Sequence, residues 1–114
     1  MKSKALEKTK TQMRRGVLEL CTLSIIAEEE AYTSDIIQKL KDADLIVVEG
    51  TLYPLLSRLK ESKLLKYNWK ESTSGPPRKY YQITEEGLVF LSQLQGTWDN
   101  LVTAVNKSTK NYIK

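Results

Sequence analysis

Polar side chains that could recognise another molecule gather in residues 49–59, which read Glu-Gly-Thr-Leu-Tyr-Pro-Leu-Leu-Ser-Arg-Leu. The leucines recur at i, i+3, i+4 and i+7, a spacing that places side chains on one stripe of a helix. They are Leu52, Leu55, Leu56 and Leu59. The free side of this predicted helix carries Thr51, Tyr53, Ser57 and Arg58. Hydroxyls donate and accept hydrogen bonds and a guanidinium pairs with anions, so the chemistry is non-covalent recognition.

Pro54 locates the start of this helix, because proline lacks an N–H and fits a helix within its first turn. The helix is therefore predicted to begin within residues 49–51. A shorter helix is predicted before it, capped by Thr33 or Ser34 and ending near Ala43. Two helices joined by a short connection, the second with an exposed polar face, form the helix-turn-helix arrangement whose second helix enters the major groove of DNA.

Two strands are predicted after Ser62 from residues that alternate between apolar and polar. The apolar positions are Leu65, Tyr67 and Trp69 in the first strand and Tyr81 and Ile83 in the second. Residues 72–77 between them read Ser-Thr-Ser-Gly-Pro-Pro, so a β-hairpin with a long tip is expected. Trp69, Tyr80 and Tyr81 are interpreted as hairpin packing residues, because duplex DNA offers no free base face for stacking.

Residues 49–59, together with Pro-Arg-Lys-Tyr-Tyr-Gln-Ile-Thr-Glu-Glu-Gly at residues 77–87, resemble the PadR family of winged-helix transcriptional regulators. The motifs lie in matching order and cover most of residues 13–87. The resemblance implies a mainly helical fold with a small β-hairpin: a winged helix-turn-helix with a long C-terminal dimerisation helix. The expected division is a DNA-binding domain over residues 1–83 and a dimerisation helix with its tail over residues 84–114.

The surface expected to bind double-stranded DNA has three parts. They are the helix predicted over residues 49–59, called the reading helix, the predicted β-hairpin, called the wing, and one residue of the helix before the reading helix. Its members are Ser34, Thr51, Tyr53, Pro54, Ser57, Arg58, Gly75, Arg78 and Lys79. For Arg78 and Lys79, the match to the family wing favours phosphate contacts over an ordinary charged strand end. Family members usually carry a tyrosine near the DNA backbone where Ser34 stands, so Ser34 offers a smaller hydroxyl contact. The arginine that they often have at Pro76 is absent, which predicts a weaker wing contact.

A first helix is predicted from about Met13 to Ala27, with an earlier start as the alternative, and a basic segment leads into it. The cations of that segment are Lys2, Lys4, Lys8, Lys10, Arg14 and Arg15. A solvated end is the preferred interpretation of this segment, and an arm along a phosphate backbone is the alternative. Cys21, within the apolar part of the helix, is interpreted as a buried and inert cysteine.

A last helix is predicted from Thr84 to about Lys107, with a seam at the three-four spacing of a short coiled coil. The seam is Leu91, Leu94, Trp98, Leu101 and Val105. It favours a homodimer, because the helix projects past the small winged domain. Trp98 is wide for such a seam, which leaves two interpretations. Either the paired helices of the dimer enclose a gap lined by Gln95, Trp98 and Val102, or Trp98 fills the interface. Short-form PadR members sandwich planar drugs between a matching tryptophan pair, which favours a planar aromatic effector.

The composition weighs against enzymatic function. The chain of 114 residues has a net charge of +4, no histidine and one cysteine, so no catalytic residue, cofactor or metal site is expected. The apolar run at residues 17–23 is too short to span a bilayer, which predicts a cytoplasmic protein without membrane contact. The expected function is a repressor that binds a near-palindromic operator and is released by a small-molecule effector. The alternative is a winged-helix module that binds protein and not DNA.

Overall fold

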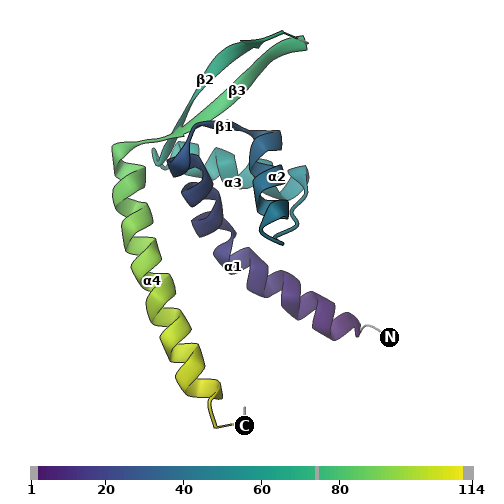
Figure 1. The fold of residues 1–114 in the computed structure, drawn as a ribbon, viewed down its shortest axis with the longest axis vertical. Coiled ribbons are helices and arrows are strands. Elements are labelled where there is room, and N and C mark those ends of the chain that lie inside the picture. The colour runs from purple at the N-terminus through teal and green to yellow at the C-terminus, as the bar shows by residue number, and fades with distance from the viewer. Residues whose placement is uncertain (1–2, 74, 112–114) are drawn as a thin grey trace.

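The computed structural model describes residues 3–73 and 75–111. Helices and strands follow one another in the order α1 (Lys4–Glu28), β1 (Ala31–Tyr32), α2 (Thr33–Asp42), α3 (Glu49–Glu61), β2 (Leu65–Ser72), β3 (Gly75–Ile83) and α4 (Glu85–Thr109). Figure 1 shows α2, α3 and the end of α1 gathered under the sheet, with α4 and the start of α1 extending away from this body. This is the predicted winged helix-turn-helix with a long C-terminal helix, so the fold class is confirmed.

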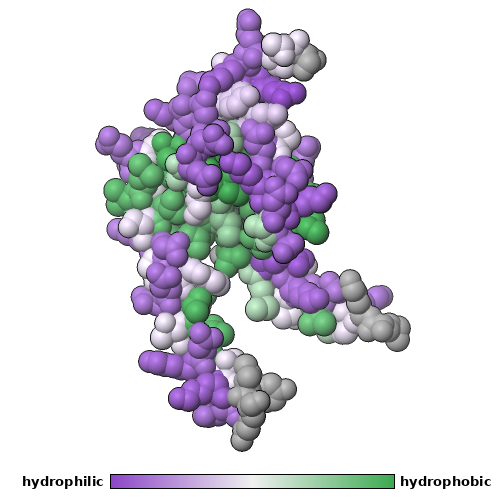
Figure 2. All heavy atoms as spheres, in the orientation of Figure 1, coloured by the Kyte–Doolittle hydropathy of each residue, from purple (hydrophilic) through white to green (hydrophobic). Residues whose placement is uncertain are grey.

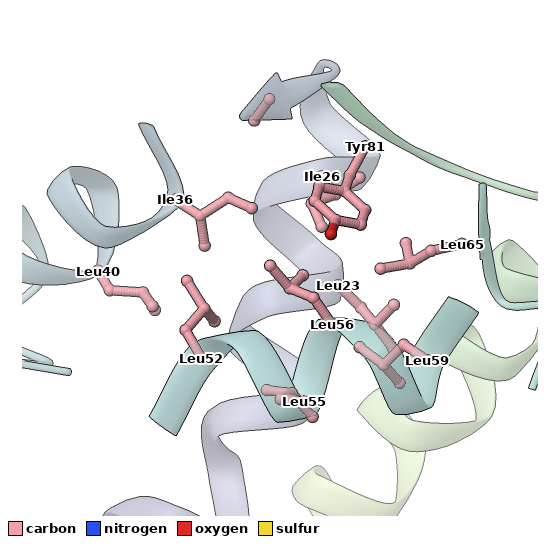
Figure 3. Packing of buried hydrophobic residues seen from close by; sticks show 11 residues of the cluster. Leu23, Ile26, Ile36, Leu40, Leu52, Leu55, Leu56, Leu59, Leu65 and Tyr81 are labelled. Atoms are coloured by element: carbon pink, nitrogen blue, oxygen red, sulfur yellow. The ribbon is translucent and has the colours of Figure 1, made fainter. Parts of the chain in front are cut away.

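The core lies between α1, α2, α3 and the sheet (Figure 3). All four leucines of the predicted stripe on α3 are buried. Figure 3 shows Leu52, Leu56 and Leu59 extending toward the core residues of α1 and α2. Because this stripe is fully used by the core, the opposite side of α3 is the side that remains free. The periodicity of residues 49–59 therefore predicted both faces of this helix.

The sheet has three strands in the antiparallel order β1-β3-β2. The two-residue strand β1 was not predicted, and it pairs Ala31 with Tyr81. The hairpin tip is shorter than expected, because β2 continues to Ser72 and β3 begins at Gly75. Ser74 of the predicted turn lies outside the described residues. Successive N–H groups of a strand point to opposite sides, so the two prolines at residues 76–77 need both sides of β3 to be free of regular pairing. On one side β1 does not reach this part of the strand, and on the other the ladder with β2 is irregular between Lys70 and Ser72.

Helix α1 begins at Lys4, well before the predicted Met13. Ser3 caps it by accepting a hydrogen bond from the Leu6 N–H at 3.3 Å. The basic segment is thus helical from Lys4 onward. Strong helix formers such as alanine, leucine, glutamate and lysine dominate this segment, and glycine first appears at Gly16, so nothing in it stops the helix.

The start of α2 differs slightly from expectation, whereas α3 starts as expected. Tyr32, and not Thr33 or Ser34, is the N-cap of α2, and the Asp35 carboxylate accepts its N–H at 3.3 Å. Helix α3 begins at Glu49, within the predicted range. Pro54 is therefore one turn further in, and it cannot donate a hydrogen bond to the carbonyl four residues earlier. That carbonyl belongs to an exposed glycine, which water can reach.

Thr84 caps the start of helix α4: it accepts a hydrogen bond from the Gly87 N–H at 2.9 Å and donates one to the Lys63 carbonyl at 2.7 Å. Gly87 lies so close to the preceding loop that a Cβ there would stand 2.2 Å from the Leu64 carbonyl oxygen. The first half of α4 is thereby fixed to the body. The second half carries exposed apolar residues, and Figure 2 shows hydrophobic side chains continuing along it beyond the body. Within the described residues, no helix is long and apolar enough to cross a membrane.

Candidate nucleic-acid interface

A hollow of about 440 Å³ lies between α2, α3 and the hairpin. Its walls are Tyr32, Thr33, Ser34, Glu49, Tyr53, Trp69, Arg78, Lys79 and Tyr81. Four residues of the predicted DNA-binding set meet here although they come from three separate elements: Ser34, Tyr53, Arg78 and Lys79. The fold thus joins the start of the reading helix to the wing in one cationic, hydroxyl-bearing surface.

The rest of the predicted set lies around this hollow or away from it. Thr51, Pro54 and Ser57 are exposed along the free side of α3, and Gly75 is exposed where β3 begins. Thr51 and Pro54 also line a second groove, between α3 and α1. The exposed surface of α3 therefore runs from the hollow toward α1.

Arg58 differs from the other predicted DNA-binding residues because it forms an ion pair inside the chain. Its Nη2 lies 2.7 Å from Oε1 of Glu19 on α1. The Glu19 side chain is only 23% exposed, so this pair is partly shielded from water. Arg58 therefore links α3 to α1, and a DNA contact by this guanidinium would have to share it with a carboxylate.

Arg78 lies on the outer face of the sheet against Tyr32. Its guanidinium carbon is 4.6 Å from the centre of the Tyr32 ring, a cation–π distance. The Tyr32 ring in turn meets the edge of Tyr80, with ring centres 5.1 Å apart. Tyr80 also lies under the ammonium of Lys70, at 4.9 Å. Aromatic residues thus hold the Arg78 guanidinium against the outer face of the wing.

Lys79 points to the opposite face of β3, because successive side chains of a strand alternate. Its Nζ is 4.3 Å from the ring centre of Tyr67 and 5.3 Å from that of Trp69. Within the part of the chain that the structure describes, neither Arg78 nor Lys79 forms an ion pair with a carboxylate. Both charges remain available to an anionic partner.

Lys70, by contrast, is neutralised by Glu30. The Lys70 ammonium donates to Oε1 of Glu30, and the Gln82 amide donates to Oε2 at 2.8 Å. These two hydrogen bonds, first the one from Lys70, lower the pKa of Glu30 below its ordinary value. The carboxylate therefore stays charged. It links the end of α1 to β2 through Lys70 and to β3 through Gln82.

Sequence reasoning missed Tyr32, Glu49 and Trp69 as parts of this site. Trp69 was interpreted as a hairpin packing residue, and it contacts Tyr67 and Lys79 within the hairpin. It is also 62% exposed, whereas Tyr81 of the same hollow is 5% exposed. Burial raises the pKa of Tyr81, so its hydroxyl stays neutral at ordinary pH. Alternation correctly put Trp69 on the core side of β2. It gave no signal that the hairpin extends beyond the core at this residue.

A second candidate site is a groove of about 570 Å³ between α1 and α4. Its walls are Met13, Arg14, Gly16, Val17, Leu20, Leu94, Thr97, Trp98, Leu101, Val102, Val105 and Asn106. Trp98 and Val102 of the predicted effector site lie in it, together with most of the predicted seam. Gln95 does not line it, and its amide donates to Asp99 at 3.3 Å instead. Leu91 packs toward the core.

Residues suited to metal binding do not cluster in the described ranges 3–73 and 75–111. No group of three or more cysteine, aspartate or glutamate side chains there could hold a metal ion. Cys21 is half-buried in α1, and burial raises the pKa of its thiol, so little reactive thiolate is present at neutral pH.

The helix-turn-helix of α2 and α3, followed by a hairpin that carries unpaired cations, defines a winged-helix domain of the nucleic-acid-binding type. The model of the transcriptional regulator PadR-like family matches residues 22–93, and the chain belongs to this family. The recognition from sequence is thereby confirmed. Regulators of the PadR family bind DNA.

Solved structures of PadR-type proteins share the fold. A PadR-like transcription factor from Bacteroides fragilis is 58% identical, with a TM-score of 0.73 over 88% of this chain and 97% of that chain. A PadR family regulator from Eggerthella lenta is 35% identical, with a TM-score of 0.84 over 90% of each chain. An uncharacterized protein of Lysinibacillus sphaericus is 31% identical over 74% of this chain and 80% of its own length.

Proposed function

We propose that this protein is a homodimeric repressor that binds a near-palindromic DNA operator and is released by a small-molecule effector. The observation that carries the DNA-binding part is the hollow in which α2, the start of α3 and the wing present Ser34, Tyr53, Arg78 and Lys79 together. Membership in a family of transcriptional regulators supports the same conclusion.

In this proposal α3 enters the major groove and the wing follows the backbone. Thr51, Tyr53, Pro54 and Ser57 face base edges, which carry the sequence information. Arg78 and Lys79, with the backbone at Gly75, contact phosphates and set position. Ser34 stands in the first turn of α2, where free N–H groups favour a phosphate oxygen.

The dimer is proposed to form through the second half of α4, supported by α1. Leu101 is 50% exposed and Val105 is 48% exposed, and both line the apolar groove beside Trp98. A two-fold axis along this seam would place two reading helices about 34 Å apart, one turn of DNA. The proposed division is then DNA binding by residues 1–83 and dimerisation by residues 84–114.

The effector is proposed to be a planar aromatic molecule held against Trp98. The α1–α4 groove offers an apolar wall with an indole on it, which suits a flat ring. In the dimer, two such walls would face each other. We also propose that the protein is cytoplasmic and has no enzymatic activity. Repression of this kind needs DNA, a second copy of the chain and the effector, and it includes no chemical step.

The wing charges provide the direct test of DNA binding. The double change Arg78→Ala with Lys79→Ala should weaken binding to operator and random duplex alike. It should also flatten the slope of log affinity against log salt by about 2, because about one counterion is released per phosphate contact. Fluorescence anisotropy of labelled duplex at several salt concentrations measures both quantities.

A matched control removes two charges far from the hollow, by Lys107→Ala with Lys110→Ala at the end of α4. This control should leave affinity and slope nearly unchanged. If both double variants bind alike, the wing does not contact phosphate and the protein-binding alternative gains. Changes at Tyr53 or Ser57 should instead shift the preference among operator sequences.

A further inference from the structure

Trp69 is a large exposed side chain in a place where neither the core nor the α4 seam explains it. It lies on β2 and is 62% exposed. The alternate residues before it, Leu65 and Tyr67, face the core and are buried and half-buried. Trp69 continues their side of the strand past the edge of the body, so an indole is presented beside the reading helix.

Neighbouring side chains hold this indole in place. Lys79 is its direct partner across the ladder, and its ammonium lies 5.3 Å from the Trp69 ring centre. The Tyr67 ring meets it edge-on, with ring centres 6.3 Å apart. An exposed aromatic residue that is oriented by two contacts loses little further freedom on binding. An indole held in one orientation therefore suits a binding surface better than a freely rotating one would.

Trp69 lines the hollow between α2, α3 and the hairpin. Tyr53 of α3, Ser34 of α2 and Lys79 line it together with Trp69. The wing contributes two cations and the helices contribute hydroxyls, against the one carboxylate of Glu49, so the surface is net cationic and complements a polyanion that is rich in hydrogen-bond acceptors. Trp69 is thus part of the surface that the proposed DNA complex would cover.

We propose that Trp69 is a DNA-contacting residue of the wing, with the indole N–H donating to a phosphate oxygen and the ring lying against a deoxyribose. This inference rests on the proposed DNA binding. Stacking on a base is not required, because paired bases expose no face in a duplex. The contact reads the backbone, so it strengthens binding to operator and random sequence alike.

Tryptophan fluorescence tests this contact directly, because the chain has two tryptophans. In a Trp98→Phe background, Trp69 is the remaining emitter. Titration with unlabelled duplex should change its emission along the same curve that anisotropy of labelled duplex gives for binding. Trp98 lies in the proposed dimer seam, so the anisotropy curve of the Trp98→Phe protein itself is the reference for its emission curve.

Substitution provides the second measurement. Trp69→Ala should raise the dissociation constant about five- to tenfold for operator and random duplex. Trp69→Phe keeps a ring for Lys79 but lacks the N–H, and should raise it about threefold. The salt slope should stay unchanged in both variants because no charge is removed.

The outcomes separate this inference from the proposed function. If anisotropy detects no DNA binding by the unaltered protein, the proposed function itself fails. If anisotropy shows binding while Trp69 emission stays constant and Trp69→Ala binds as tightly as the unaltered protein, DNA binding stands and the Trp69 contact is wrong. A loss of affinity in Trp69→Ala that is matched by a loss of thermal stability would assign Trp69 to folding and also overturn the inference.

Discussion

The Arg78 guanidinium lies over the face of the Tyr32 ring, with 4.6 Å between the guanidinium carbon and the ring centre. Tyr32 ends the short strand β1 and caps α2, so the wing cation is held by the element that also starts the helix-turn-helix. The position of Arg78 therefore depends on a residue outside the wing.

Tyr32→Ala should weaken DNA binding about two- to fivefold, because an exposed cation–π contact contributes about 0.5–1 kcal/mol. Tyr32→Phe keeps the ring face and is the matched control, with affinity close to the unaltered protein. Anisotropy measures both, and the salt slope should not change. Equal losses in the two variants would assign the effect to the tyrosine hydroxyl and not to the ring.

Gly87→Ala should destabilise the fold by about 1–3 kcal/mol or more, because its Cβ would stand 2.2 Å from a backbone oxygen. Gly96→Ala on the same helix meets nothing within 4 Å and should stabilise the protein by about 0.5–1 kcal/mol. Urea unfolding at one fixed protein concentration measures both changes. Equal stabilities would show that the start of α4 does not pack on the loop as described.

Glu30 should make a pH-dependent contribution to stability. Its pKa is lowered in the folded state by Lys70 and Gln82, so the contribution is present above the unfolded-state pKa and is lost as pH falls through the folded-state pKa. Lys70→Met should move the pKa of Glu30 back up toward its ordinary value in a carboxyl NMR titration. Lys107→Met, which removes a charge at the far end of α4, should leave the Glu30 titration as it was.

Leu101→Asp with Val105→Asp should yield monomers, because a dimer would bury unpaired carboxylates. These residues are preferable to Leu94, which packs against the chain's own core. Asn100→Asp with Thr103→Asp adds the same charge to exposed α4 residues outside the groove and should remain dimeric. Sedimentation measures the mass, and operator affinity of the monomer should fall at least about a hundredfold. A full dimer with both seam residues changed would contradict this interface.

A planar aromatic cation should quench Trp98 emission with saturable binding. In a Trp69→Phe background, Trp98 is the remaining tryptophan, so the signal reports the α1–α4 groove. Trp98→Ala should abolish dye binding measured by equilibrium dialysis while the dimer persists. Undiminished dye binding by Trp98→Ala would place the effector, if it binds, away from this groove.

The spacing of apolar residues predicted the elements whose buried side follows from a pattern within the element itself. The leucine stripe of α3 and the alternation from Leu65 to Tyr67 each assigned a buried side, and the structure confirms these assignments. Strand β1 escaped prediction because it has two residues and exists through pairing with β3. No spacing within one helix could reveal that Arg58 pairs with Glu19 of another.

The candidate site was predictable in composition more than in geometry. Arg78 and Lys79 were identified as wing cations, but their placement on opposite faces of β3, each against its own aromatic neighbours, depends on the register of the ladder. Trp69 and Tyr32 joined the site through contacts between segments far apart in the chain. Such contacts are set by tertiary packing, which periodicity does not encode.

The register of the hairpin also determines where the protein can accept added length. One residue inserted between Lys79 and Tyr81 would move both cations to the opposite face and exchange their aromatic neighbours. Residues inserted between Ser72 and Gly75, at the tip end of the ladder, would leave the pairing of Trp69 with Lys79 untouched. The tip is therefore a point where a grafted peptide or a natural extension could lengthen the reach along DNA without disturbing the pairing of Trp69 with Lys79.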